Sequence, residues 1–296
     1  MEEWWAKYKG QIPCAGIFYP EEDWLDFHSR SGFKLFTYRF HTPNPKALIF
    51  FFHGLWSSSG SFTHIAQRLS EENYEILAFD QEGHGRSEGP RGKVASIENC
   101  INNAIDFISV AKEFYPENIP IFLMGGSMGG LVCINVALRF PALIRGLVLL
   151  APALGVNLYF PGIVSKFSRF ISYIWSNLPI ANANPGLASR NEAYPSWFRE
   201  NPDNYAGKLT IGTASALLKG ILDLQNHWKS LETAFILFQG GNDYTVSLET
   251  ATNFVNSCQV EDKEIVLYEN MNHAVSCEPE IFEIIEKIQI WVGCRL

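Results

Sequence analysis

Six short, almost uninterrupted apolar runs recur along the 296-residue chain. Strands that are buried on both faces of a parallel sheet have this composition, because neither face meets water. Helical patterns separate several of the runs: Ile97, Ile101 and Ile108 fall on one stripe, and residues 281–291 repeat it near the end. This alternation predicts a doubly wound α/β fold, with a mostly parallel sheet and helices on both faces. The runs are ALIFFFHG (47–54), YEILAFD (74–80), PIFLMGGS (120–127), GLVLLAPA (146–153), AFILFQGG (234–241) and EIVLYEN (264–270).

Two other segments complete the expected organisation. Near the N-terminus, LDFHSRSGFKLFTYRF (25–40) alternates around Ser31-Gly32, which predicts an antiparallel hairpin. Residues 155–230 are rich in helix signals, aromatic residues, Asn and Pro, and they contain no comparable apolar run. We therefore expect an inserted helical cap at 155–230, between a first part of the core at 1–154 and a second part at 231–296.

One serine stands among four glycines in IFLMGGSMGG (121–130), at the end of the third apolar run. A helical pattern follows directly, so Ser127 is predicted at a strand-to-helix turn. Gly125 and Gly129 bracket it in a G-x-S-x-G pattern, which lets the backbone turn sharply and expose the hydroxyl. The pattern favours a nucleophile, although a glycine-rich connection without chemistry would have the same composition.

A serine nucleophile needs an imidazole to remove its proton and a carboxylate to orient that imidazole. Asp243 follows the fifth apolar run, and His273 follows the sixth. The carboxyl ends of parallel strands meet at one edge of the sheet, where α/β folds bind their ligands. Ser127, Asp243 and His273 also occur in the chain order of α/β-hydrolases. Taken singly, the aspartate could shape a turn and the histidine could lie in an ordinary loop.

The reaction also needs N–H donors for the oxygen that becomes negatively charged. The backbone N–H of Leu55, after the His53-Gly54 turn, and that of Met128, at the start of the predicted helix, are the candidates. His53 is interpreted as an organiser of its loop, and His84 in the glycine-rich loop 79–92 is given a structural role. The remaining histidines have no metal-ligand spacing, so no metal and no cofactor are expected.

Composition narrows the possible partners and locations. A net charge of −8 and the absence of a Lys/Arg cluster argue against nucleic acid. The first residues, MEEWWAKYKG, lack the features of a secretory signal, and the six cysteines are scattered. No apolar run is long enough to span a membrane. These features favour a cytoplasmic protein.

Taken together, the motifs resemble the monoacylglycerol lipase and lysophospholipase branch of the α/β-hydrolases. The resemblance rests on HGLWSSSGSF, DQEGHGRSEGPRG, GGSMGG, LLAPAL, GNDYTV and the NH before EPE, and it extends from about residue 25 to the C-terminus. It implies hydrolysis of carboxylic esters, with Ser127 as nucleophile, His273 as general base, Asp243 as its orienter, and Leu55 and Met128 as oxyanion-hole donors. Glycerol-recognising members carry an acidic and a basic residue after His-Gly, whereas this chain has Leu55-Trp56 and then serines, of which Ser57 and Ser61 offer hydroxyls.

The substrate expected from this resemblance is a lipid-like ester, such as a monoacylglycerol or a lysophospholipid. A small-molecule esterase, a thioesterase, an aminopeptidase or a non-catalytic binding protein remains as an alternative. Within the expected cap, an apolar stripe runs through residues 160–180 (Ile163, Phe167, Phe170, Ile171, Ile174 and Leu178). Two interpretations stay open: the stripe packs over the mouth of the site, or part of it faces outward as a lid that touches lipid surfaces.

Overall fold

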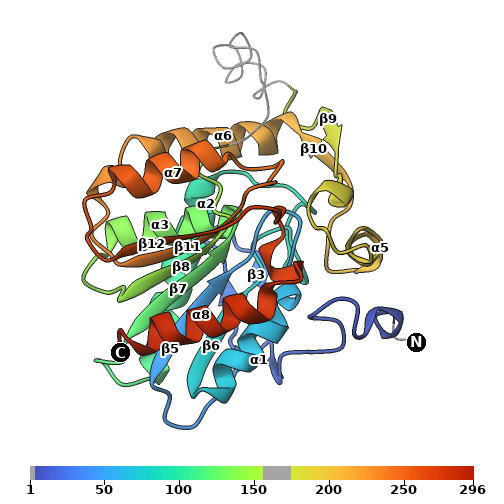
Figure 1. Cartoon of the computed structure of the whole chain (residues 1–296). Helices are drawn as coiled ribbons and strands as arrows, with labels where there is room; N and C mark the ends of the chain where they lie inside the picture. The colour runs from blue at the N-terminus through green and yellow to red at the C-terminus, as the bar shows by residue number, and fades with distance from the viewer. Residues whose placement is uncertain (1–3, 156–174) are drawn as a thin grey trace.

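A computed structural model describes residues 4–155 and 175–296, built around an eight-stranded sheet (Figure 1). The strand order is β1-β4-β6-β5-β7-β8-β11-β12. The strands from β6 to β12 in this order run parallel, and β4 pairs antiparallel with β1 and β6. These parallel strands are the six apolar runs, so the predicted sheet is confirmed. The bounds are β1 Glu21–Glu22, β4 Thr37–Phe40, β5 Ala47–Phe52, β6 Tyr74–Phe79, β7 Ile121–Gly126, β8 Gly146–Leu150, β11 Phe235–Gly240 and β12 Lys263–Tyr268.

Helices cover both faces of the sheet, as predicted (Figure 1). Helices α1 and α8 pack together on one face, and α2 and α3 pack together on the other. The central strands β5, β6 and β7 are buried at every residue because they lie between these two layers. Ser96 is the N-cap of α2 and Ser247 that of α7. Each side chain accepts a hydrogen bond from the backbone N–H three residues later. The bounds are α1 Thr63–Glu71, α2 Ile97–Ala111, α3 Met128–Arg139, α7 Leu248–Ser257 and α8 Ile281–Gly293. No helix in the described part of the chain combines the length and apolar character needed to cross a bilayer.

The N-terminal hairpin is present but shorter than the sequence predicted. Strands β2 (Phe27–His28) and β3 (Lys34–Leu35) pair antiparallel around a turn in which Gly32 has a φ of 86°. Only glycine adopts this backbone conformation without steric cost. The rest of the expected second strand forms β4 and joins the main sheet beside β6.

Between β8 and β11, the described residues interrupt the alternation of strand and helix. They comprise β9 Pro179–Asn182, α5 Tyr194–Glu200, β10 Lys208–Thr210 and α6 Ile211–Gln225. The predicted helices are present, but β9 and β10 also form an antiparallel ribbon that the sequence did not reveal. All four β9 side chains are exposed, so the ribbon has no buried face to produce an apolar pattern. The stripe from Ile163 to Ile174 lies outside the described residues, and the division of the chain at 155 and 230 stays a prediction.

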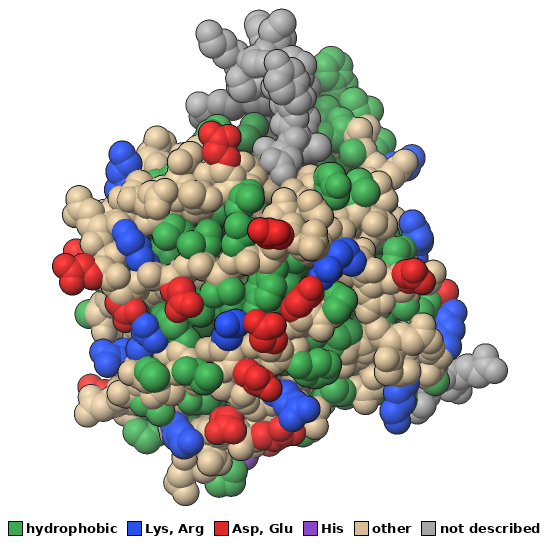
Figure 2. Space-filling model, viewed as in Figure 1, with side chains coloured by type: hydrophobic (Ala, Val, Ile, Leu, Met, Phe, Trp, Pro, Cys, Tyr) green, Lys and Arg blue, Asp and Glu red, His purple; other side chains and the backbone are tan. Residues whose placement is uncertain are grey.

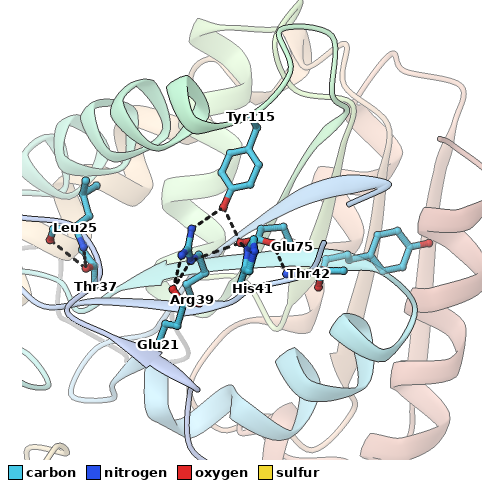
Figure 3. Close-up of polar contacts among 9 residues, drawn as sticks. Glu21, Leu25, Thr37, Arg39, His41, Thr42, Glu75 and Tyr115 are labelled. Carbon is cyan, nitrogen blue, oxygen red and sulfur yellow. Dashed lines mark hydrogen bonds and ion pairs between the residues drawn. The ribbon is translucent and has the colours of Figure 1, made fainter. Parts of the chain in front are cut away.

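A buried carboxylate near the start of β6 contacts residues from several elements (Figure 3). It lies at the end of the sheet opposite the carboxyl ends of the parallel strands. Glu75 is completely buried. Its side chain accepts hydrogen bonds from the Thr42 backbone N–H at 2.7 Å and from the Tyr115 hydroxyl at 2.6 Å. His41 Nδ1 lies 3.2 Å and Arg39 Nε 3.8 Å from the same carboxylate. These polar groups compensate the cost of taking the charge out of water.

We expect Glu75→Gln to lower the free energy of unfolding by about 2–3 kcal/mol, because charge-assisted hydrogen bonds are lost in a buried site. Urea unfolding followed by circular dichroism measures this change. Arg30→Gln is the matched control, since it breaks the exposed two-bonded pair with Asp106. Such surface pairs contribute about 0–1 kcal/mol. Equal effects of the two variants would contradict a stabilising role for Glu75.

Candidate active site

Ser127 lies at a sharp turn between β7 and α3, as predicted. Its φ of 51° and ψ of −115° are backbone angles that residues other than glycine rarely adopt. The flanking glycines are required by close packing: a Cβ at Gly125 would lie 2.4 Å from the backbone of Gly129, and one at Gly129 would lie 1.8 Å from the Phe52 carbonyl oxygen. The turn therefore holds one partly exposed hydroxyl at the carboxyl end of β7.

Asp243 and His273 are brought together by the loops that follow β11 and β12. His273 Nδ1 lies 2.8 Å from Asp243 Oδ2. The other carboxylate oxygen accepts the backbone N–H groups of Thr245 at 2.8 Å and Val246 at 3.0 Å. Burial alone would raise the pKa of Asp243, but the charge and hydrogen bond of His273 and the two backbone donors outweigh it and lower this pKa. An ionised carboxylate only accepts hydrogen bonds, so Nδ1 carries the proton and Nε2 is left as the basic nitrogen.

Ser127 lies at the same edge of the sheet as these two residues. Its strand, β7, runs parallel to β11 and β12, and only β8 lies between β7 and β11. Within the described ranges, His273 bonds to Asp243 but not to the Ser127 hydroxyl. Hydrogen bonds between a nucleophile and its base are often long in an empty site and shorten when substrate binds.

The loop after β5 approaches the nucleophile closely. A Cβ at Gly54 would lie 3.2 Å from Ser127 Cβ, which places Leu55 beside the serine turn. The His53 ring fixes this loop by bonding to the Gly54 carbonyl at 2.8 Å and by accepting the Gln81 N–H at 2.9 Å. Burial lowers the pKa of His53 to about 4, so the ring is neutral and serves as an organiser of the loop. Met128 is the first residue of α3, where backbone N–H groups have no partner within the helix.

Asp80 is a supporting residue that the sequence analysis did not single out. It is completely buried at the end of β6 and accepts hydrogen bonds from the Ser59 N–H at 2.7 Å, the Tyr38 hydroxyl at 2.8 Å and the Arg86 N–H at 2.9 Å. Burial raises its pKa despite these bonds. Asp80 thus joins the loop after β5 to the loop after β6. The sequence signal that could have identified Asp80 is its position directly after a buried strand.

Comparison with known proteins identifies the family. A family model described as serine aminopeptidase, S33, matches residues 43–280, which is most of the chain. The chain belongs to this family. Among residues 4–155 and 175–296 of this S33 chain, no group of three or more His, Cys, Asp or Glu side chains could hold a metal ion.

Individual relatives of this S33 chain are monoacylglycerol lipases. The monoglyceride lipase of Mus musculus is 27% identical over 285 residues, covering 94% of this chain and 92% of that protein. The monoacylglycerol lipase of Mycolicibacterium smegmatis is 23% identical over 253 residues, with 86% and 90% coverage. The crystal structure of the Paleococcus ferrophilus monoacylglycerol lipase superposes with a TM-score of 0.78 at 25% identity, covering 88% of this chain and 99% of that one. These comparisons confirm the predicted family resemblance, the α/β-hydrolase fold and the prediction that the protein is a serine hydrolase. The roles of single residues stay predictions.

Proposed function

We propose that this protein hydrolyses carboxylic esters of monoacylglycerols or lysophospholipids through an acyl-enzyme intermediate. The hydrogen bond of 2.8 Å between His273 and the buried Asp243 carries the proposal, because it prepares a basic imidazole nitrogen at the edge of the sheet that bears Ser127. Monoacylglycerol lipases among the relatives support the choice of substrate.

The proposed reaction begins when His273 Nε2 removes the proton of the Ser127 hydroxyl. The serine oxygen attacks the ester carbonyl, and the backbone N–H groups of Leu55 and Met128 stabilise the negative oxygen. His273 then protonates the leaving alcohol. A water molecule, activated by the same imidazole, releases the fatty acid from Ser127. Asp243 stabilises the imidazolium in both steps.

The polar head group would be recognised near the loop after β5. Ser57 is partly exposed, whereas Ser61 is buried, so Ser57 is the hydroxyl that a glycerol or phosphate ester can reach. The loop lacks the acidic and basic residues of glycerol-recognising members, so its contacts to a head group would be made by hydroxyls.

Labelling with a fluorophosphonate tests this function, since only an activated serine reacts. We expect labelling of the parent protein and loss of labelling in Ser127→Ala. Turnover of a monoacylglycerol, a lysophosphatidylcholine, a short p-nitrophenyl ester, a thioester and an aminoacyl anilide then separates the substrate classes. The aminoacyl anilide matters because the family description is that of an aminopeptidase. Labelling without ester turnover would exclude the lipase function, and no labelling would indicate a non-catalytic protein.

The region between β8 and β11 would act as a cap whose apolar surface contacts lipid. Trp175 is 56% exposed, Leu178 51% and Ile180 43%, and β9 has no buried residue. Figure 2 shows hydrophobic side chains gathered at the end of the molecule that carries β9 and β10 in Figure 1. A long-chain ester has to leave a membrane or micelle, and an apolar surface beside the site would hold the enzyme there.

We expect the triple variant Trp175→Ser, Leu178→Ser and Ile180→Ser to bind phosphatidylcholine liposomes at least ~10-fold more weakly, because burying each large apolar side chain contributes about 1.5–3 kcal/mol. Turnover of the short soluble ester should stay within twofold. Ile290→Ser is the control, since Ile290 is 67% exposed on α8. Unchanged co-sedimentation of the triple variant with liposomes would contradict the lipid contact.

A further inference from the structure

The loop that carries His273 is held by a second segment, Leu187–Asn191. The main contact between them joins Arg190 to Glu278, which lies 88 residues later in the chain. The Ala274 backbone N–H donates to the Ala188 carbonyl at 2.6 Å, directly beside His273. Ser189 Oγ donates to the Cys277 carbonyl at 3.3 Å, and Asn272 Nδ2 donates to the Leu187 carbonyl at 3.4 Å. These contacts lie on both sides of His273 in the sequence.

An ion pair between Arg190 and Glu278 closes this arrangement. Arg190 donates twice to the Glu278 carboxylate, from its backbone N–H at 2.7 Å and from its side-chain Nε at 2.6 Å. It also bonds to Glu280. Glu278 is completely buried, and Arg190 retains a 31% exposed side chain. A carboxylate without access to water depends on its partner, because the charge cannot be solvated if that partner is removed.

The loop is therefore held from two sides. On one side Asp243 bonds to the His273 ring, and the Asn242 N–H donates to the Met271 carbonyl at 3.0 Å. On the other side Arg190 holds Glu278, five residues after His273. Neither Arg190 nor Glu278 has a role in the chemistry proposed above.

We propose that Arg190 and Glu278 are positioning residues, which fix the imidazole of His273 against Asp243 by anchoring its loop to Leu187–Asn191. This inference rests on the proposed function, in which His273 is the general base. Because Arg190 lies in the region between β8 and β11, the pair links the proposed cap to the base. Displacing a catalytic group by about 1 Å costs up to ~100-fold in rate, so a loosened loop should reduce kcat.

Steady-state kinetics with the short soluble ester give the first test. We expect Arg190→Gln to lower kcat by roughly 10- to 100-fold with KM within threefold. Arg190→Lys should restore part of kcat, because it returns the charge but not the guanidinium that bonds to Glu278 and Glu280 at once. Glu75→Gln is the matched control, since it also disturbs a buried carboxylate but at the opposite end of the sheet. Its kcat should stay within twofold despite a lowered melting temperature. An Arg190→Gln kcat within twofold of the parent, or equal losses of kcat in Arg190→Gln and Glu75→Gln, would overturn the proposal.

A proton NMR measurement tests the same point without any turnover. The proton that His273 Nδ1 shares with Asp243 should give a far-downfield resonance that is missing in Asp243→Asn. We expect this resonance to broaden or vanish in Arg190→Gln and Glu278→Gln, and to remain in Arg30→Gln and Glu75→Gln. An unchanged resonance in the folded Arg190→Gln and Glu278→Gln proteins would overturn the positioning role. If the parent protein lacks Ser127-dependent ester turnover, the proposed function fails, while this resonance still reports whether the pair positions His273.

Discussion

Ser127→Ala should reduce ester hydrolysis by about a thousandfold or more while the protein stays folded. The reason is that the hydroxyl forms the covalent bond to the acyl group, and neither His273 nor the oxyanion-hole donors can replace it. The turn itself does not depend on the hydroxyl, because its shape is set by Gly125 and Gly129 packing against backbone. Initial rates with a short p-nitrophenyl ester and a melting curve for each protein provide the measurement.

Ser70→Ala is the control for this substitution. Ser70 bonds to the Gln67 carbonyl within α1, away from the carboxyl ends of the strands, and its loss should leave turnover within twofold. Near-normal turnover in folded Ser127→Ala would show that another residue is the nucleophile.

Asp243→Asn should lower kcat by about 10³- to 10⁴-fold with little loss of secondary structure. An amide can donate its N–H to His273 Nδ1, which favours the tautomer with the proton on Nε2 and removes the base from the serine. The substitution also changes the acid stability of the fold. Folding lowers the pKa of Asp243, so its ionised form stabilises the protein at neutral pH, and this contribution is lost as the pH falls through the lowered value. The free energy of unfolding of the Asn variant should therefore depend less on pH in the acid range.

Asp262→Asn serves as the matched control, because Asp262 pairs with Arg295 at the surface before β12 begins. We expect its kcat to equal that of the parent. Full activity of Asp243→Asn would mean that a different carboxylate orients His273.

The sequence predicted the elements whose pattern follows from burial or from backbone sterics. Five of the six parallel strands are buried at every residue, which explains their apolar runs, whereas β12 at the edge of the sheet is only partly buried. The glycines around Ser127 are dictated by contacts that exclude a Cβ. The pairing of Asp243 with His273 followed from their positions after neighbouring strands of the sheet. In each case a local signal and the topology of the fold agree.

The features that sequence analysis missed have no such local signal. The β9-β10 ribbon is exposed, and β1 has two residues, which is too short for a periodic pattern. The Arg190–Glu278 pair joins residues far apart in the chain, and single charged residues in polar segments are usually solvated. Such contacts are determined by how the loops pack after the sheet has formed.

The strand order has a consequence for how activity appears during folding. Ser127 follows β7, but its proposed partners follow β11 and β12, and β8 lies between β7 and β11. Ser127 cannot come together with Asp243 and His273 until the C-terminal half of the sheet has paired. Parallel pairing across long loops is slow. A refolding chain should thus regain secondary structure before it regains esterase activity, and a ribosome-bound chain that ends before β12 should be inactive even with Ser127 already in its turn.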